Sequence, residues 1–163
     1  MSTISTTTGN TPAQRLVELG ITLPPAPAPI ANFVTHVREG NLLFLSGQGP
    51  LDADGTLSKG KVGTDVSVEK AYADARLTGI NLLAVMQEVL GDLGRVKRVV
   101  KLLGMVNAAP DFCDHPAVIN GCSDLFNDVF GPQGVHARSA IGMGSLPNQI
   151  TVEIEAIIAL NDD

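Results

Sequence analysis

A chain of 163 residues and 17.0 kDa, with 44% hydrophobic and 17% charged residues, has the size and composition of one globular domain and not of a disordered protein. Its formal net charge of −6 disfavours nucleic acid as a partner, because an acidic surface repels phosphates. No apolar run approaches the roughly 20 residues of a membrane span, and the N-terminus lacks the basic and apolar regions of a secretory signal, so we expect a cytoplasmic protein without membrane contact.

Helix-capping residues and prolines predict an N-terminal extension, followed by a domain that begins with a proline-rich strap. Residues 1–22 are predicted to form an N-terminal extension, loose over its Ser/Thr-rich start and helical over 11–20, where Thr11 takes the N-cap position. Residues 23–32 hold four prolines and should run extended, as a strap across the surface. We expect residues 23–163 to form a single domain.

The middle of the chain predicts a hairpin, a long helix and a strand. Two strand-like runs in 33–47 flank Glu39-Gly40-Asn41, where glycine and asparagine suit a tight turn. A helix should begin after Ser67 and end near Leu90, because apolar residues there keep three- and four-residue spacing. Residues 98–107 form the next predicted strand.

The last third predicts a helix and two strands. Asp114 should cap the helix, and two apolar strands within 136–160 are expected to form a closing hairpin. The predicted order is therefore ββαβαββ, a mixed sheet of the α+β class with two helices on one face.

The strands predict a sheet that is apolar on both faces. Apolar residues follow one another without alternation in LLFLS, VVKLLGMV and IEAIIAL. Two helices cover one face, so the other most economically packs against a second copy of the chain. The alternative is that the strap and the N-terminal helix cover it.

Three charged residues, Arg138, Glu153 and Glu155, interrupt the closing apolar strands. Successive strand residues alternate between faces. Taking the odd-numbered residues of the first strand and the even-numbered residues of the second as core, we predict that all three charges share the face opposite the helices. There Arg138 either pairs with Glu155 or binds the carboxylate of a small ligand with its planar guanidinium, and both interpretations stay open.

The same strands resemble the signature of the RidA family, also called YjgF, of enamine and imine deaminases. The matching residues are Ala137-Arg138-Ser139, Ile141, Gly144, Leu146-Pro147 and Val152-Glu153-Ile154. A second match is LFLSGQGP at 43–50, which resembles the family's strand-ending Ser-Gly-Gln-x-Pro. The resemblance extends over residues 27–160, and the order of the elements agrees.

The resemblance implies a chorismate-mutase-like fold and a homotrimer whose sheets form a central barrel, with sites in the clefts between subunits. The implied reaction is hydrolysis of small 2-imino and 2-enamino acids, such as 2-aminoacrylate, to a 2-keto acid and ammonia. No metal or organic cofactor is implied. The residues agree, since Cys113 and Cys122 are too few and too widely spaced for a zinc site.

Carried over residue by residue, the resemblance assigns two catalytic roles. Arg138 would grip the substrate carboxylate, and Glu153 would hold the water that attacks the imine carbon. The backbone N–H groups of Gly47 and Ala140 would support the carboxylate, and Ser46 would line the pocket.

The sequence departs from the family pattern at three positions. Phe33 stands where the family has tyrosine, so it can pack on a substrate but offers no hydroxyl. Ala140 replaces a cysteine, and His136 replaces a proline. His136 shares the parity of Arg138 and either reaches the cleft or serves the structure. With the longer N-terminus, these changes indicate a divergent branch.

The departures motivate a second hypothesis, a non-catalytic trimer that binds a small carboxylate. A third follows the family's other label, endoribonuclease L-PSP. The acidic charge and the absence of a basic patch disfavour this third hypothesis.

Overall fold

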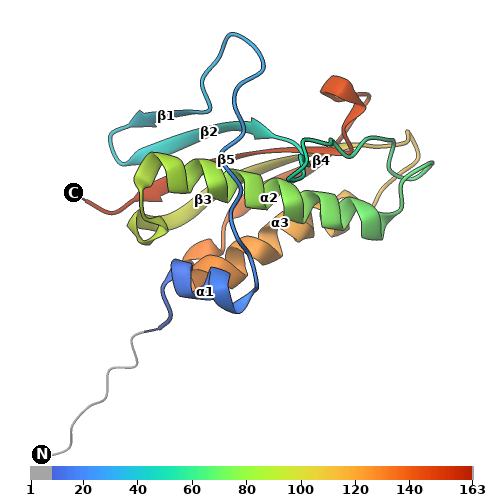
Figure 1. The fold of residues 1–163 in the computed structure, drawn as a ribbon. Coiled ribbons are helices and arrows are strands. Elements are labelled where there is room, and N and C mark those ends of the chain that lie inside the picture. The colour runs from blue at the N-terminus through green and yellow to red at the C-terminus, as the bar shows by residue number, and fades with distance from the viewer. Residues whose placement is uncertain (1–8, 163) are drawn as a thin grey trace, which may run out of the picture.

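The structure, a computed structural model, describes residues 9–162; most of the predicted loose segment therefore lies outside the described residues. A five-stranded mixed sheet has the strand order β1-β2-β5-β3-β4. The elements are α1 (Pro12–Glu18), β1 (His36–Glu39), β2 (Leu42–Gln48), α2 (Val68–Leu90), β3 (Val96–Asn107), α3 (His115–Phe130), β4 (Ala137–Met143) and β5 (Val152–Leu160), with 3₁₀ turns η1 (Leu93–Arg95), η2 (Gly131–Gly134) and η3 (Pro147–Gln149). Figure 1 shows this ββαβαββ order, preceded by α1.

The helices begin and end close to the predicted residues. Thr11 caps α1 and makes a reciprocal capping box with Gln14. The hydroxyl of Ser67 accepts the N–H of Lys70 at the start of α2, and Gly91 ends this helix in the left-handed conformation. At α3 the structure differs in detail from the prediction: Asp114 takes the N-cap position, but its side chain makes no capping hydrogen bond.

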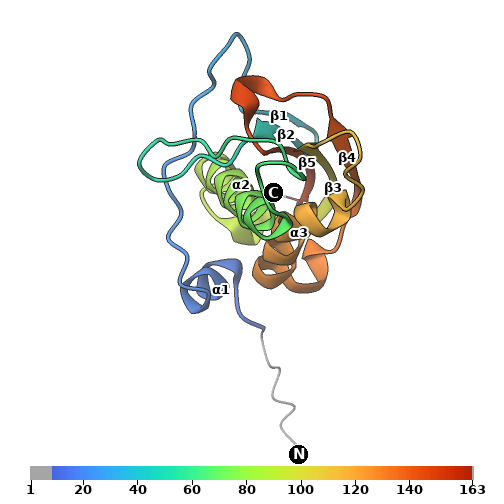
Figure 2. The ribbon, with the colours of Figure 1, turned by 90° about the vertical axis from the view of Figure 1, so that its right-hand side faces the viewer.

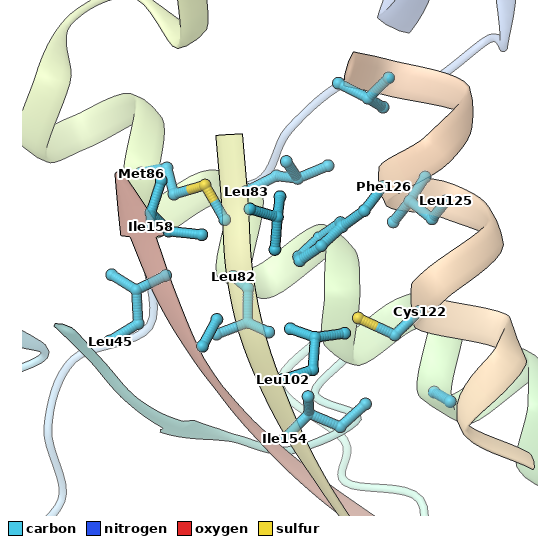
Figure 3. Close-up of a cluster of buried hydrophobic side chains, with 14 of the residues drawn as sticks. Leu45, Leu82, Leu83, Met86, Leu102, Cys122, Leu125, Phe126, Ile154 and Ile158 are labelled. Carbon is cyan, nitrogen blue, oxygen red and sulfur yellow. The ribbon is translucent and has the colours of Figure 1, made fainter. Parts of the chain in front are cut away.

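Helices α2 and α3 lie on one face of the curved sheet, as predicted (Figure 2). Between the helices and the sheet lies the hydrophobic core, part of which is shown in Figure 3. The two helices approach closely at Gly121, where an added Cβ would lie 2.0 Å from the carbonyl oxygen of Tyr72. Burial of this apolar interface is the main stabilising term of the fold.

α1 and the start of the strap lie on the helix side of the molecule, whereas residues 27–31 pass the edge of the sheet and reach Glu153 (Figure 1). Leu16 of α1 is buried in the core, and Leu23 and Ala26 of the strap pack against its edge. The N-terminal segments border the open face only near Glu153 and leave most of it uncovered, which argues against that alternative. Phe44 and Ile141 on this face are 40% and 43% exposed, so the face remains available for the predicted contact with a second copy.

The predicted closing hairpin is wrong. β4 and β5 are not neighbours, because β3 lies between them. β4 runs parallel to β3, and β5 runs antiparallel to it. The chain crosses from β3 through α3 to reach β4, which is the usual route between parallel strands. η3 and its flanking residues then carry the chain from the edge strand β4 to the interior position of β5.

The predicted common face of the three charged residues is wrong for Arg138. Arg138 of β4 pairs with Leu102 of β3, which in turn pairs with Ala156 of β5. Residues paired across neighbouring strands point to one face, and Leu102 and Ala156 are buried beneath the helices. Arg138 therefore faces the helices, whereas Glu153 and Glu155 belong to the open face.

The parity rule failed because β4 is an edge strand. Its helix-facing residues next to Arg138 are small, namely Ala140 and Gly142, and the ring of His115 lies where a side chain at Gly142 would be. The large apolar residue of β4, Ile141, lies on the open face. Apolarity in β4 thus marks the open face of the sheet and not the core.

Candidate functional site

Glu153 lies over a β-bulge in β2. The register between β2 and β5 shifts between Leu45 and Gln48, so β2 carries one extra residue there. Gly47 lies within this bulge. A Cβ added at Gly47 would lie 3.0 Å from both Cγ and Cδ of Glu153, so the glycine leaves the space that the carboxylate side chain occupies.

Glu153 is half-buried, and its carboxyl group has a raised pKa. Burial is the larger cause, and the negative charge of Glu155 adds to it. A carboxyl group whose pKa is shifted towards neutrality can accept a proton from water and return it later. The catalytic role of Glu153 stays a prediction, with which its half-buried position and raised pKa are compatible.

The carboxylate of Glu153 borders a cavity of about 410 Å³. One wall is the outer part of the strap, and the other is formed by the end of β2, the loop that follows it and η3. Phe33 and Gly47, two predicted site residues, line it together with Glu153. The structure therefore brings these three residues to one cavity.

Phe33 also borders a larger hollow of about 610 Å³ on the open face, which Ser46 and Glu155 share. The hydroxyl of Ser46 donates a hydrogen bond to the carbonyl oxygen of Val34 at 2.6 Å. Ser46 therefore ties the segment between the strap and β1 to β2, and its oxygen can still accept a hydrogen bond. The sequence predicted Ser46 in the same pocket as Glu153, but Ser46 borders this hollow and is not among the residues that line the cavity of Glu153.

Arg138 is held by α3. Its Nη1 donates to the hydroxyl oxygen of Ser123 at 2.9 Å, and its Nη2 donates to the carbonyl oxygen of Pro116 at 3.2 Å. Ser123 is 8% exposed, so it is a buried partner with a fixed position. These contacts fix one edge of the guanidinium plane against the helix.

His136 completes a hydrogen-bonded chain behind Arg138. Its Nδ1 lies 2.5 Å from the carbonyl oxygen of Gly134, and its Nε2 lies 2.9 Å from the hydroxyl oxygen of Ser123. A carbonyl oxygen only accepts, so Nδ1 carries the proton and Nε2 accepts from Ser123. Burial, with a contribution from the charge of Arg138, lowers the pKa of His136 and favours this neutral form.

Sequence reasoning missed Ser123. A signal was present, because Ser123 lies one turn after Ile119 and three residues before Phe126 on the buried side of α3. A hydroxyl on an apolar helix face needs a hydrogen-bond partner. Without the fold, nothing identified that partner as Arg138. Ala140, the remaining predicted residue, packs partly buried against the core.

Arg138 and Glu153 cannot hold one small substrate within a single chain. Arg138 is level with Ala156 across β3, and Glu153 lies three residues further along β5. With roughly 4.8 Å between strands and 3.3 Å per residue, their Cα atoms are about 14 Å apart, and their side chains leave opposite faces. The same argument rules out the pairing of Arg138 with Glu155 inside one chain.

The described residues contain no group of three or more His, Cys, Asp or Glu side chains that could hold a metal ion. Cys122 is buried, which raises the pKa of its thiol, and Cys113 is exposed. No helix among residues 9–162 is both long and apolar enough to cross a membrane.

A family model described as "YjgF/chorismate_mutase-like, putative endoribonuclease" matches residues 13–153. The chain belongs to the YjgF/RidA family. The family and the chorismate-mutase-like α+β fold that the closing signature predicted are thereby confirmed.

Two curated proteins are similar to this chain over most of its length. Protein TCP17 of Trypanosoma cruzi is 44% identical over 92% of this chain and 94% of its own length. The 2-iminobutanoate/2-iminopropanoate deaminase of Salmonella typhimurium is 31% identical over 81% of this chain and 90% of its own.

Solved structures share the fold of this chain. Protein Atu1372 of Agrobacterium tumefaciens, a protein with unknown function, has a TM-score of 0.86 and 44% identity, with 92% of both chains covered. TdcF of E. coli, solved with bound serine, has a TM-score of 0.59 and 26% identity over 84% of this chain and 94% of its own. A relative of this chain thus binds a small amino acid.

Proposed function

We propose that the protein hydrolyses small 2-imino and 2-enamino acids of the 2-aminoacrylate type to a 2-keto acid and ammonia. The observation that carries this proposal is the half-buried carboxyl group of Glu153, which has a raised pKa and borders a cavity beside Gly47 and Phe33. Relatives named as 2-iminobutanoate/2-iminopropanoate deaminases support the same chemistry.

The reaction needs water as its only co-reactant. A 2-enamino acid first takes a proton from solvent at its β-carbon to give the iminium form of the imine. Glu153 then accepts a proton from water while the water oxygen bonds to the iminium carbon, giving a neutral carbinolamine. Glu153 passes this proton to the nitrogen; as the C–N bond breaks and ammonia leaves, the hydroxyl proton returns to the Glu153 carboxylate or to solvent and the C=O bond of the 2-keto acid forms. Because the imine carbon is already electrophilic, the main tasks of the protein are to place the water and to fix the substrate.

Arg138 fixes the substrate carboxylate in this proposal. Two of its N–H groups are bound to Ser123 and Pro116, and a guanidinium has five. The others can bind a carboxylate, with the N–H groups of Gly47 and Ala140 in support. Since Arg138 and Glu153 leave opposite faces, we propose that Arg138 of one copy and Glu153 of another share each site, at the contact between copies in a homotrimer.

Direct assay of the purified protein tests the activity. 2-Aminoacrylate would be generated from serine by a pyridoxal-phosphate-dependent dehydratase, and the release of keto acid followed with and without the protein. We expect clear acceleration, and a loss of at least about 100-fold in kcat/KM for Arg138→Ala and for Glu153→Gln, because each variant removes an interaction used in the transition state. If keto acid is released no faster with the wild-type protein than without it, the proposal is overturned.

A second function, a non-catalytic carboxylate-binding trimer, is favoured by Phe33 and Ala140, which lack the hydroxyl and the thiol of the family pattern. Thermal shift with 2-keto acids separates the two: stabilisation without turnover supports binding alone. The endoribonuclease label finds no support in the charge of −6. Cleavage of RNA by the purified wild-type protein, lost in Glu153→Gln, would revive it.

A further inference from the structure

We propose that the cavity beneath the proline strap binds the apolar side chain of the substrate, so that the protein prefers 2-imino acids with a branched aliphatic or aromatic side chain over the smallest ones. This inference rests on the proposed function and names the substrate class of the same site. It depends on the strap, the proline-rich segment of residues 23–32.

The strap forms a continuous apolar wall. Residues 27–31, in the sequence Pro-Ala-Pro-Ile-Ala, line the cavity from one side. From the other side, Leu51, Leu57 and Ile150 complete it. Ile150 is 5% exposed and is fixed against Gly49, where an added Cβ would lie 2.8 Å from its Cδ1.

The two walls come from segments distant in sequence. Figure 2 shows the outer loop of the strap and η3 at the same end of the molecule, beyond the sheet. Glu153 is the charged residue in the lining, and Gln48 and Asn148 are its other polar side chains. A concave, mostly apolar cavity with a few polar groups and one carboxyl of shifted pKa is the usual form of a small-molecule site.

The geometry relates this cavity to the reacting carbon. In the proposed mechanism, Glu153 holds the attacking water, so the imine carbon lies next to its carboxylate. The side chain of the substrate begins one bond from that carbon. We place it in the space that the strap covers, because that apolar space borders Glu153. The cavity of about 410 Å³ is more than ten times the roughly 30 Å³ that one water molecule occupies, so it has room for an isobutyl or a benzyl group.

The test compares small and large ligands in two measurements. An L-amino acid oxidase would generate the imino acids of alanine and leucine, and competition with a chemical trap would give kcat/KM for each. Calorimetry would give the affinity of the intact protein for pyruvate and for 4-methyl-2-oxopentanoate, without any need for turnover. We expect the larger compound to be favoured at least about tenfold in both, because each buried methylene in an apolar pocket favours binding.

A matched pair of variants locates the effect. Ala28→Phe adds a ring to the cavity wall at an exposed strap residue, and Asn32→Phe adds the same ring to the strap outside the lining. We expect Ala28→Phe to lower the ratio of large to small substrate at least about tenfold, and Asn32→Phe to leave the ratio as in the wild type.

The outcomes separate this inference from the proposed function. Turnover without a preference for the larger substrate, or an unchanged ratio in Ala28→Phe, overturns the inference and leaves the function standing. That result is also expected if a neighbouring copy of the chain fills the cavity. A calorimetric preference without turnover overturns the function and supports the cavity. Binding of neither keto acid, with no turnover, overturns both.

Discussion

Arg138 and Glu153 lie on opposite faces of one sheet, with β3 between their strands. If they share a site, each must come from a different copy of the chain. This arrangement predicts complementation between two inactive variants. Co-expressed Arg138→Ala and Glu153→Gln chains should recover about one quarter of wild-type activity, because about three quarters of random trimers are mixed and each mixed trimer has one intact site of three.

The control for this experiment is the double variant, which carries both substitutions on one chain, co-expressed with Arg138→Ala. Neither chain in that mixture has an intact Arg138, so no site can form and the mixture should stay inactive. Mass spectrometry of the purified assemblies would confirm that the subunits mix. Mixed assemblies of the two single variants without any recovered activity would show that the site is not shared between copies.

Ser123 holds Arg138 from α3, and His136 holds Ser123. Ser123→Ala should raise KM for the imino acid about 3- to 10-fold and change kcat little, because a weaker anchor affects ground state and transition state alike. Asn127→Ala, one turn further along α3 at an exposed position, is the control and should behave as the wild type. A fall in kcat with an unchanged KM would mean that Ser123 does not act through the carboxylate anchor.

Gly47 leaves room for the side chain of Glu153. Gly47→Ala would place a methyl group 3.0 Å from two carbons of that side chain, so we expect unfolding free energy to fall by about 1–3 kcal/mol and activity to fall with it. Urea unfolding measures the first effect. Gly144→Ala is the matched control, because it makes the same substitution at a position where a Cβ meets nothing within 4 Å. It should change the free energy of unfolding by less than about 0.5 kcal/mol.

The raised pKa of Glu153 predicts a pH-dependent effect on stability. The folded protein holds this proton more tightly than the unfolded chain, so protonation favours folding and stability is lost as pH rises from the ordinary value of 4.5 through the raised one. Glu153→Gln should therefore raise Tm at pH 7 by about 1–2 °C. Below pH 4.5 the difference should vanish. An equal gain at both pH values would assign the effect to packing and not to charge.

Local chemistry made much of the fold predictable. Ser67 and Gly91 bound α2 because a hydroxyl caps the free N–H groups at one end and a glycine adopts the left-handed conformation at the other. The signature around Arg138 and Glu153 was specific enough to identify the family. These features depend on short stretches of chain, so the sequence contains what is needed to infer them.

The position of β4 could not be inferred in this way. A turn of eight residues between two apolar strands resembles a hairpin loop, and the parallel partner of β4 is determined by the crossover through α3. Because β4 is an edge strand, its apolar residues do not mark the face that packs on the core. Arg138 therefore lies on the helix side, opposite to the prediction. The hydrogen-bonded chain through Ser123 and His136 depends on that same placement, so it too required the fold.

The four prolines of the strap have a consequence for conformational entropy. Each pyrrolidine ring fixes φ in the unfolded chain as well as in the folded one. Ordering the strap therefore costs less entropy than ordering ten ordinary residues would, although no strand partner holds residues 23–32. The wall of the cavity can thus be rigid before a ligand arrives, and a ligand that enters it would lose little affinity to the ordering of the protein.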